Sequence, residues 1–558
     1  MARDPEPGGA FVFDLVDDGA ADPAAPLAPP AAAAVDDPDG ERPDADGAVP
    51  GEPSAGSGRM LRGAAPVAAV LAIVLGTGLA MDGVRDAARS ERMRDVHGGV
   101  VDVSAPLTET WAWEGAVGSR IAVEEGLGIE VAVLGDVLAF ESGAELVALS
   151  AATGAEAWTV PLGADPDCGP TGSTGWGQVT TSALVCLGGP ETDRAVTVIG
   201  PDGVVSAQRV LSAADTRRFG EPRPGPGGTV VRAERTGRVP TSGLGDGECT
   251  ELGECTGTVR AGQDLTVRAE DAVTGAERWR VTIPFRPTPA DQCANWYGTS
   301  WDGSGTAVNL NSMLDPGGFG ARVTDRLVQL YGCGVEAVIT ADGVLLGTEI
   351  EPGTGSVESL RSGGYTSYTY SEDVRTVLYD SAGTVVGEID GYAAEPSAVD
   401  GSGPDTLLGV GEPGAKVTAY EADGTPRWDA EVTTDAQSFL AQAAGTAVVL
   451  TGGGTVRGLD LASGEERWAW NGTAPDEYGA DLYVSRSFTD GQFVLLVVEN
   501  GYGSAGLVSL DAVSGEMAWE QHGEDAALGG AGQVGGSGLL AIDGNILEVT
   551  PDGVRGLG

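Results

Sequence analysis

The sequence predicts an all-β β-propeller of about eight four-stranded blades, closed by its own terminal strands and preceded by one transmembrane helix and a disordered tail. Three observations lead to this prediction. A turn-and-tryptophan motif repeats five times, one uncharged stretch is long enough to span a bilayer, and the first 58 residues show little apolar periodicity. Repeated units that cannot bury their own apolar faces stack into arrays.

The repeat consists of a strand-like apolar run, a turn glycine and a tryptophan. Glycine supplies the positive φ of a tight reversal, so each copy is predicted to be a β-hairpin. We expect each Trp to fill the gap between one sheet and the next, since an aromatic binding surface would not require the same spacing five times. The five copies are Leu146–Trp158, Val267–Trp279, Val417–Trp428, Val456–Trp468 and Leu507–Trp519.

Three weaker copies keep the turn and lose the Trp, namely Val196–Gly203, Ala337–Gly343 and Val377–Gly383. The turns then number eight internal copies and one split copy. We expect eight blades, on the interpretation that one weak copy is an insertion, and seven or nine stay open. The last turn, Pro551–Gly553, leaves almost no chain for a further strand. The strand-like run Leu107–Glu114 is therefore expected to complete the final blade and close the ring, which removes exposed sheet edges.

The copy Leu507–Trp519 reads Leu-Val-Ser-Leu-Asp-Ala-Val-Ser-Gly-Glu-Met-Ala-Trp and resembles the repeat of the quinoprotein-type (pyrroloquinoline-quinone-like) β-propellers. The similarity covers residues 105–558. That family includes quinone-dependent dehydrogenases, cofactor-free scaffolds and sensor portions of bacterial receptors, so membership does not imply catalysis. The tryptophans expected to hold the blades together are Trp111, Trp113, Trp158, Trp279, Trp428, Trp468 and Trp519.

The residues that quinone enzymes use are not recognisable in this chain. The resemblance implies two adjacent cysteines over the cofactor, and no two cysteines are neighbours here. His97 and His522 are the only histidines and Lys416 is the only lysine, which leaves few candidates for base, metal or Schiff-base chemistry. We therefore predict a non-enzymatic scaffold or sensor with no cofactor and no metal. A quinone-dependent oxidoreductase with unrecognised ligands is the alternative.

Residues 1–58 are rich in Ala, Pro, Asp and Glu and are predicted to be disordered. Phe11, Phe13 and Leu15 form an apolar cluster in this tail. The cluster is either a chance grouping or a short motif that folds on a cytoplasmic partner, in which case the tail relays ligand binding inward. The net charge of −50 argues against nucleic acid or anionic lipid as the main partner.

The segment 59–82 is predicted to be a single transmembrane helix. Gly63–Met81 carries no charge and would span about 28 Å as a helix, close to the apolar thickness of a bilayer. A cleaved signal peptide is the alternative, but signal peptides have short n-regions. A juxtamembrane linker is expected over 83–104. Arginines follow the span as well as precede it, so the distribution of positive charge does not favour export of the propeller.

The cysteines favour export nonetheless, because all of them lie in the propeller and none forms a CxxC motif. Pairing of neighbours would give Cys168–Cys186, Cys249–Cys255 and Cys293–Cys333, although six cysteines allow fifteen connectivities. The expected location is the plasma membrane of a bacterium, with the propeller extracytoplasmic and the N-terminus cytoplasmic.

Two stretches are predicted to be loop insertions, from about Arg217 to Thr256 and from Pro287 to Gly320. Propeller loops are frequent binding sites. The insertions are either decorative, disulfide-stapled loops or a contact surface for a protein, peptide or glycan. In the second case Trp296, Tyr297 and Trp301 are the candidate anchors.

Overall fold

The computed structural model describes residues 86–558 except 119–128, 174–178, 191–192, 239–247, 250–254, 291–319, 349, 351–354, 370–373, 411–415, 433–435, 473–482, 500–504 and 523–537. The expected tail (1–58) and transmembrane segment (59–82) therefore lie outside the described residues. Within the described part, no helix is both long and apolar enough to cross a membrane. Leu75–Gly558 form one compact unit.

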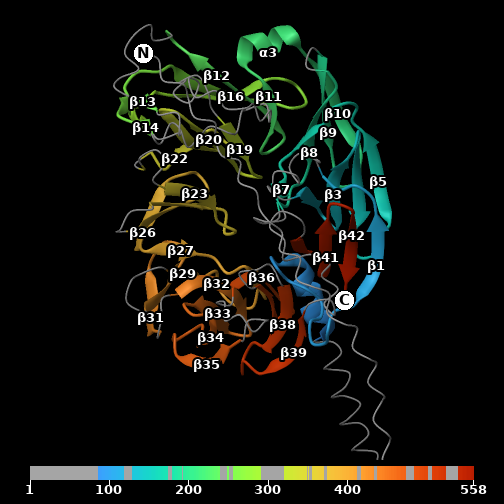
Figure 1. Cartoon of the computed structure of the whole chain (residues 1–558), viewed down its shortest axis with the longest axis vertical. Helices are drawn as coiled ribbons and strands as arrows, with labels where there is room; N and C mark the ends of the chain where they lie inside the picture. The colour runs from blue at the N-terminus through green and yellow to red at the C-terminus, as the bar shows by residue number, and fades with distance from the viewer. Residues whose placement is uncertain are drawn as a thin grey trace, which may run out of the picture. The chain divides into compact units, whose positions relative to one another are not determined.

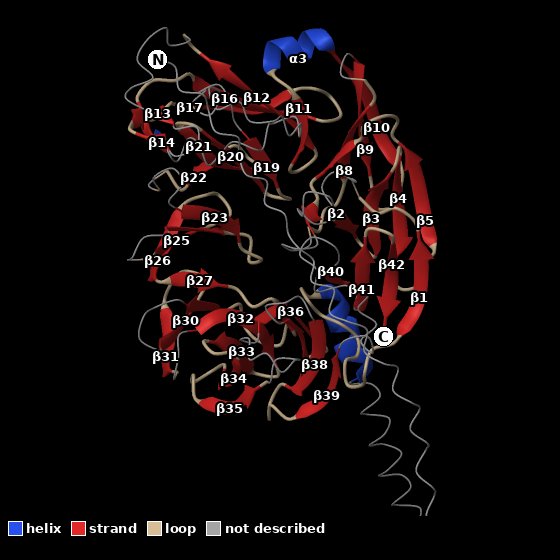
Figure 2. Ribbon diagram, in the orientation of Figure 1, coloured by secondary structure: helices blue, strands red, loops and turns tan. Residues whose placement is uncertain are grey.

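The described strands form nine sheets with four up-and-down strands each, arranged as the blades of a propeller (Figures 1 and 2). We number the blades 1 to 9 along the chain and give the strands of each from the innermost to the outermost. Blade 1 holds β2 (Glu130–Leu134), β3 (Val137–Ser142), β4 (Glu145–Ser150) and β5 (Glu156–Pro161). Blade 2 holds β6 (Asp167–Gly169), β8 (Leu184–Gly188), β9 (Asp193–Ile199) and β10 (Val205–Ser212). Blade 3 holds β11 (Pro222–Gly225), β12 (Thr229–Thr236), β16 (Asp264–Asp271) and β17 (Glu277–Ile283).

The next three blades follow the same order. Blade 4 holds β19 (Gly320–Val323), β20 (Leu327–Gly332), β21 (Val335–Thr340) and β22 (Leu345–Leu346). Blade 5 holds β23 (Gly355–Ser359), β24 (Tyr365–Thr369), β25 (Arg375–Tyr379) and β26 (Val385–Asp390). Blade 6 holds β27 (Tyr392–Ala394), β29 (Leu407–Val410), β30 (Lys416–Tyr420) and β31 (Pro426–Glu431).

The last three blades complete the set. Blade 7 holds β32 (Ala436–Ala443), β33 (Thr446–Thr451), β34 (Thr455–Asp460) and β35 (Glu466–Asn471), and β28 (Ala398–Val399) adds to it in parallel. Blade 8 holds β36 (Tyr483–Thr489), β37 (Phe493–Glu499), β38 (Ala505–Asp511) and β39 (Met517–His522). Blade 9 holds β40 (Gly538–Ile542), β41 (Asn545–Thr550), β42 (Gly553–Leu557) and β1 (Glu109–Glu114).

A few short elements lie outside the nine four-stranded patterns. The strand β7 (Gly172–Ser173) extends the sheet of blade 1 at β2. Two further pairs are β13 (Glu248–Cys249) with β14 (Cys255–Thr256), and β15 (Thr258–Val259) with β18 (Thr288–Pro289). The helix α3 (Ala213–Phe219) follows β10 and begins at the capping box of Ser212 and Asp215. Residues 86–95 are also helical.

The expected count of eight blades is wrong, because none of the weak turn copies is an insertion. Gly203, Gly343 and Gly383 each close the turn between the third and fourth strands of a blade, in blades 2, 4 and 5 respectively. All eight internal turns and the split copy therefore correspond to blades. The missing tryptophans reflect a change at the joint between blades and leave the number of strands unaffected.

The predicted closure of the ring by its two ends is confirmed. The strand β1 pairs antiparallel with β42, with Trp113 opposite Val554. Thr108 and Gly558 each donate a backbone N–H to the other's carbonyl oxygen, at 2.9 Å in both cases. Residues near the start of the described chain thus supply the outermost strand of the last blade, as Figure 1 shows.

The burial pattern explains why middle and outermost strands differ in the spacing of their apolar residues. Middle strands are sandwiched between neighbouring blades and are apolar on both faces, as in β33, where every residue is buried. Outermost strands alternate, as in β10. The cores therefore lie between blades; one of them joins Val448 and Leu450 of blade 7 to Val494 and Leu496 of blade 8.

The predicted insertion from about Arg217 to Thr256 is wrong over its described first half. That stretch contains the end of α3 and the inner strands β11 and β12 of blade 3. The Pro- and Gly-rich run 222–228 resembles a loop in sequence, but β11 is the innermost strand and pairs only with β12. An edge position of this kind tolerates proline because one side of the strand donates no ladder hydrogen bond.

The two faces of the ring differ. In several blades the turn between the first two strands is hydrogen-bonded to the turn between the last two, for example by Ala512 N–H to the Gln492 carbonyl at 2.9 Å. We call the face that carries these turns the short-turn face. Connections between the second and third strands, and between consecutive blades, start at the opposite strand ends. The longest of them, 115–129, 237–263, 284–319 and 523–537, thus leave from what we call the long-connection face.

Candidate functional site

Five tryptophans on outermost strands join each blade to the segment that follows it around the ring. Each donates its indole N–H to a backbone carbonyl of the next blade or of the N-terminal segment. The pairs are Trp158 with Pro201, Trp279 with Ala341, Trp428 with Leu461, Trp468 with Ala512 and Trp519 with Val103, at 2.8–3.1 Å. These donors are satisfied inside the protein, so they are not free to bind a ligand.

The turn glycines are packed against these rings. A Cβ atom added at Gly515 would lie 2.5 Å from Cδ2 of Trp468, and one added at Gly154 would lie 2.2 Å from Cε3 of Trp111. Gly515 has a φ of +70°. The repeated Gly and Trp are thus the two halves of one joint between neighbouring blades, which explains why they recur together. Trp113 instead donates to Glu156 at 3.2 Å and packs edge-on to Phe140.

An arginine takes the place of tryptophan at the joint between blades 2 and 3. Arg209 of β10 donates from Nε to the carbonyl of Ala272 at 2.8 Å, and its guanidinium lies beside Gly275. Its Nη2 also contacts the buried Glu270 at 3.0 Å, as do Arg232 and Arg268. The position is two residues beyond the expected Trp, so the sequence repeat could not reveal it.

The pairing of Cys168 with Cys186 is present as a disulfide between the opposed strands β6 and β8. Cys249 and Cys255 lie opposite each other in the β13–β14 pair, and Cys333 is also disulfide-bonded. Cys293 lies outside the described residues. Among the described cysteines none is free.

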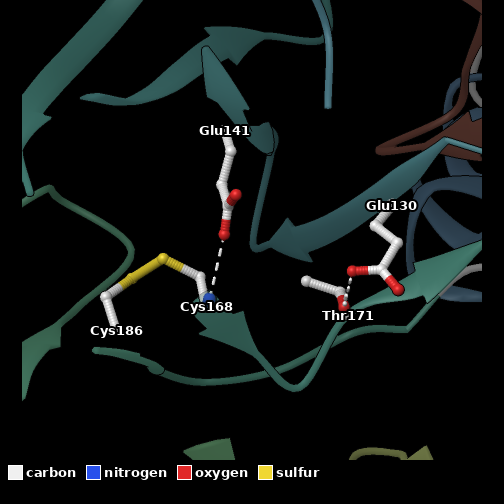
Figure 3. Close-up of a disulfide and its surroundings, with 5 residues drawn as sticks. All are labelled: Glu130, Glu141, Cys168, Thr171 and Cys186. Atoms are coloured by element: carbon white, nitrogen blue, oxygen red, sulfur yellow. Dashed lines mark hydrogen bonds between the residues drawn. A yellow bond between two sulfur atoms is a disulfide. The ribbon is translucent and has the colours of Figure 1, made fainter. Parts of the chain in front are cut away.

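Three carboxylic acids, Glu130, Glu141 and Asp167, lie on the two inner strands of blades 1 and 2 near the disulfide, and Figure 3 shows the first two of them. Glu141 of β3 accepts a hydrogen bond from the backbone N–H of Cys168 at 2.9 Å. Glu130 of β2 accepts one from Thr171 Oγ1 at 3.3 Å. Asp167, the neighbour of Cys168, lies 3.9 Å from the Arg223 guanidinium.

The protein environment makes these acids hold protons more tightly than usual. Desolvation, with the nearby charge of Asp167 second, raises the pKa of Glu141 to about 8. Desolvation also raises the pKa of Glu130 and of Asp167, and Arg223 opposes the shift at Asp167. Glu141 therefore carries a proton at neutral pH. Among the described residues, no group of three or more side chains could hold a metal ion.

The N-terminal part of the described chain is fixed to the short-turn face. Residues 86–95, within the segment expected to be a linker (83–104), form a helix whose Met93 is fully buried. The following strand-like residues bond to three blades. Val100 donates to Thr489, Val101 donates to Gly544, and the His97 carbonyl accepts from Val399.

The arginines that follow the predicted span take part in this contact. Arg92 donates from Nε to the carbonyl of Asp400 at 3.0 Å, and Arg89 donates to Gln492 at 3.0 Å. Their presence after the apolar stretch therefore has a structural cause on the propeller. This docking was missed in sequence because the residues between Met81 and Leu107 show no repeat.

The remaining predicted site residues fall outside the described part of the chain. These are the candidate loop anchors Trp296, Tyr297 and Trp301, and the tail residues Phe11, Phe13 and Leu15. The described strands that flank the loop, β18 and β19, show where its ends join the ring. As an interblade connection, it leaves from and returns to the long-connection face.

Comparison with known proteins confirms the resemblance to quinoprotein-type propellers. Residues 373–550 match the family model described as outer membrane protein assembly factor BamB. These residues cover blade 8, blade 7, blade 6 and parts of their neighbours. No protein with a curated description matches the chain.

Solved structures with a similar chain path include BamB, AztD and the dehydrogenase NirN. BamB from Moraxella catarrhalis is 12% identical, with 81% of this chain and 99% of that chain covered and a TM-score of 0.34. AztD from Citrobacter koseri is 12% identical, with 71% and 95% covered and a TM-score of 0.29. The dihydro-heme d1 dehydrogenase NirN is 11% identical, with 76% and 79% covered and a TM-score of 0.30. At these values the likenesses carry no argument about function.

Proposed function

We propose that this protein is a non-catalytic, membrane-anchored propeller that binds a protein partner outside the cytoplasm. The observation that supports the proposal most is the asymmetry of the ring. The short-turn face holds the N-terminal segment, and the opposite face receives the longest connections. Long connections on a rigid scaffold are typical binding elements. The match of residues 373–550 to an assembly-factor family fits a protein-binding role.

The proposed contact surface is the long-connection face, with Trp296, Tyr297 and Trp301 as anchors. Aromatic side chains dominate the energetics of protein interfaces, so removing one of them from a central position typically costs at least about 2 kcal/mol, or roughly 30-fold in affinity. The structural tryptophans at the joints are excluded from this role because their N–H groups are bonded within the ring. The apolar cluster of Phe11, Phe13 and Leu15 is proposed as a second contact, for a cytoplasmic partner.

Photo-crosslinking in intact cells tests the binding surface. A photoreactive amino acid at Trp296 or Trp301 should capture the same protein, whereas one at Val513, exposed on the short-turn face, should not. The purified partner should bind Trp296→Ala and Trp301→Ala variants at least roughly 30-fold more weakly, and Val513→Ala equally well. Equal capture from both faces would contradict the assignment of the surface.

The location and the lack of enzymatic activity have separate tests. A membrane-impermeant thiol reagent applied to intact cells should label a Val210→Cys variant, at a position 63% exposed on strand β10, and spare a cysteine placed in the tail, such as Ser54→Cys. The reverse pattern would contradict export. Dye-linked alcohol or sugar oxidation by the purified protein, supplied with the quinone and Ca²⁺, should be absent. Sustained turnover would favour the oxidoreductase alternative.

A further inference from the structure

The described surface carries an unusual set of exposed apolar side chains on the short-turn face. Most of the large hydrophobic residues that stay exposed lie in, or within two residues after, a turn between the third and fourth strands of a blade. They are Val204 and Val205 in blade 2, Val273 in blade 3, Val385 and Val386 in blade 5, and Val513 and Met517 in blade 8. Of the exposed large hydrophobics in the described residues, only Val210 and Tyr483 lie elsewhere. These side chains belong to four of the nine blades, 2, 3, 5 and 8, and all lie at turns on the same side of the propeller.

The same face holds the point at which the chain enters the propeller. Helix 86–95 is docked there through Met93, Arg89 and Arg92, and its first residue follows the apolar stretch Gly63–Met81 by only a few positions. If that stretch spans the membrane, as proposed above, the short chain between them keeps this face close to the bilayer.

We infer that the short-turn face rests on the membrane surface, with its exposed valines in the interfacial region of the lipid. The inference depends on the proposed anchor and specifies what the anchor does: it holds the propeller in one orientation. The long-connection face then points away from the membrane toward the partner.

Two turns on this face, in blades 3 and 7, hold an acidic side chain in a local ion pair. Asp271 and Asp460 accept hydrogen bonds from the backbone of their own turns and pair with Arg278 and Arg467. Local pairing reduces the cost of bringing the turns near lipid. Since the whole chain has a net charge of −50, the contact should not depend on anionic headgroups. Each valine contributes little alone, but a tethered surface needs only weak contacts because its effective concentration is high.

Fluorescence quenching on the full-length chain in phosphatidylcholine vesicles tests this orientation. Single cysteines at Val205 and Val513 would be labelled with an environment-sensitive dye, and vesicles would contain lipid-attached spin labels. The matched control is Val210→Cys, on the same strand β10 as Val205. The side chain of Val210 is 63% exposed and that of Val205 is 43% exposed. Five residues along a strand separate the two positions by about 17 Å. The control lies toward the long-connection face.

The expected result is quenching of the dyes at Val205 and Val513 by roughly twofold, with little effect at Val210, because interfacial groups lie within about 10 Å of the headgroup boundary. Equal quenching at all three positions, or stronger quenching at Val210, would overturn the inference. Flotation of the unlabelled chain with the same vesicles separates the two proposals. Failure to float would contradict the anchor, whereas flotation without quenching at Val205 and Val513 would contradict the orientation alone.

Discussion

The indole nitrogen of Trp519, on the outermost strand of blade 8, donates a hydrogen bond to the carbonyl oxygen of Val103, 2.9 Å away. Val103 lies in the N-terminal segment just before strand β1. Val103 is fully buried, and its carbonyl also accepts from Ser509 Oγ at 2.8 Å. Val103 therefore takes the place that a turn carbonyl occupies at the other Trp joints. The segment before β1 supplies the joint that blade 9 cannot build from a turn of its own, because that blade is assembled from both ends of the chain.

Replacing Trp519 by Phe should destabilise the protein by about 2 kcal/mol, since the hydrogen bond and part of the buried ring are lost. The Val103 carbonyl keeps its bond to Ser509, which limits the cost. Trp113→Phe is the control, because its indole bond to Glu156 is exposed. Chemical denaturation monitored by circular dichroism measures both. Equal losses for the two variants would contradict the role of Trp519 in closing the ring.

Gly515→Ala should cost about 3 kcal/mol, the sum of a left-handed backbone that alanine resists and a clash with the Trp468 ring. Gly135→Ala is a matched variant, because Gly135 has a φ of +62° but no heavy atom within 4 Å of the added Cβ. It should cost only about 1 kcal/mol. Thermal or chemical unfolding compares the two. If they lose the same stability, the packing of glycine against tryptophan does not contribute to the joint.

The proton on Glu141 makes stability depend on pH. In the unfolded chain this carboxyl loses its proton near 4.5, and in the folded protein it does so near 8. Between these values the folded state holds the extra proton, so its contribution to stability falls as pH rises. Glu141→Gln cannot ionise and still accepts the Cys168 N–H. Its melting temperature should exceed that of the wild type by roughly 1–3 °C at pH 8 and match it at pH 4.

Melting curves at both pH values measure this difference. A constant offset between Glu141→Gln and the wild type from pH 4 to pH 8 would show that Glu141 does not titrate in the predicted range. Asp167 shares the cluster, so the double variant with Asp167→Asn indicates how much of the effect the two acids share.

Removal of the disulfide should destabilise blade 2. Cys168 and Cys186 are separated by 18 residues, and a cross-link over such a loop contributes about 3 kcal/mol. The double variant Cys168→Ala/Cys186→Ala leaves two small apolar side chains in a buried site. Denaturation should shift by this amount with the fold retained. A variant as stable as the wild type would show that the cross-link is not needed to hold the short inner strand β6.

Much of the architecture follows from local turn chemistry. The repeated glycine turns predict the strands on either side, and the unpaired run at Leu107–Glu114 predicts the closure that the β1–β42 pairing shows. The sequence predicts one blade too few because the turns at Gly203, Gly343 and Gly383 lack the Trp that marks the other copies. At the joint between blades 4 and 5, Val344 and Leu346 pack against Gly383 in place of a tryptophan ring.

The candidate sites were harder to predict because they depend on contacts distant in sequence. Glu141 is the last residue but one of the strand Val137–Ser142, and this charge after an apolar run is the one sign of a special environment in the sequence. Arg209 and the docked helix 86–95 do not coincide with any position of the repeated motif, so the sequence repeat does not identify them. Ala272 meets Arg209 only when blades 2 and 3 pack together, and Gln492 and Asp400 meet the helix only when the N-terminal segment docks on distant blades.

An experimental density map of the full-length protein in a lipid nanodisc tests the central claim most directly. It should show nine blades, with residues 109–114 as the outermost strand beside 553–557 and helix 86–95 against the face of short turns. A ring of eight blades, or a map in which Trp113 lies away from Val554, would contradict this account.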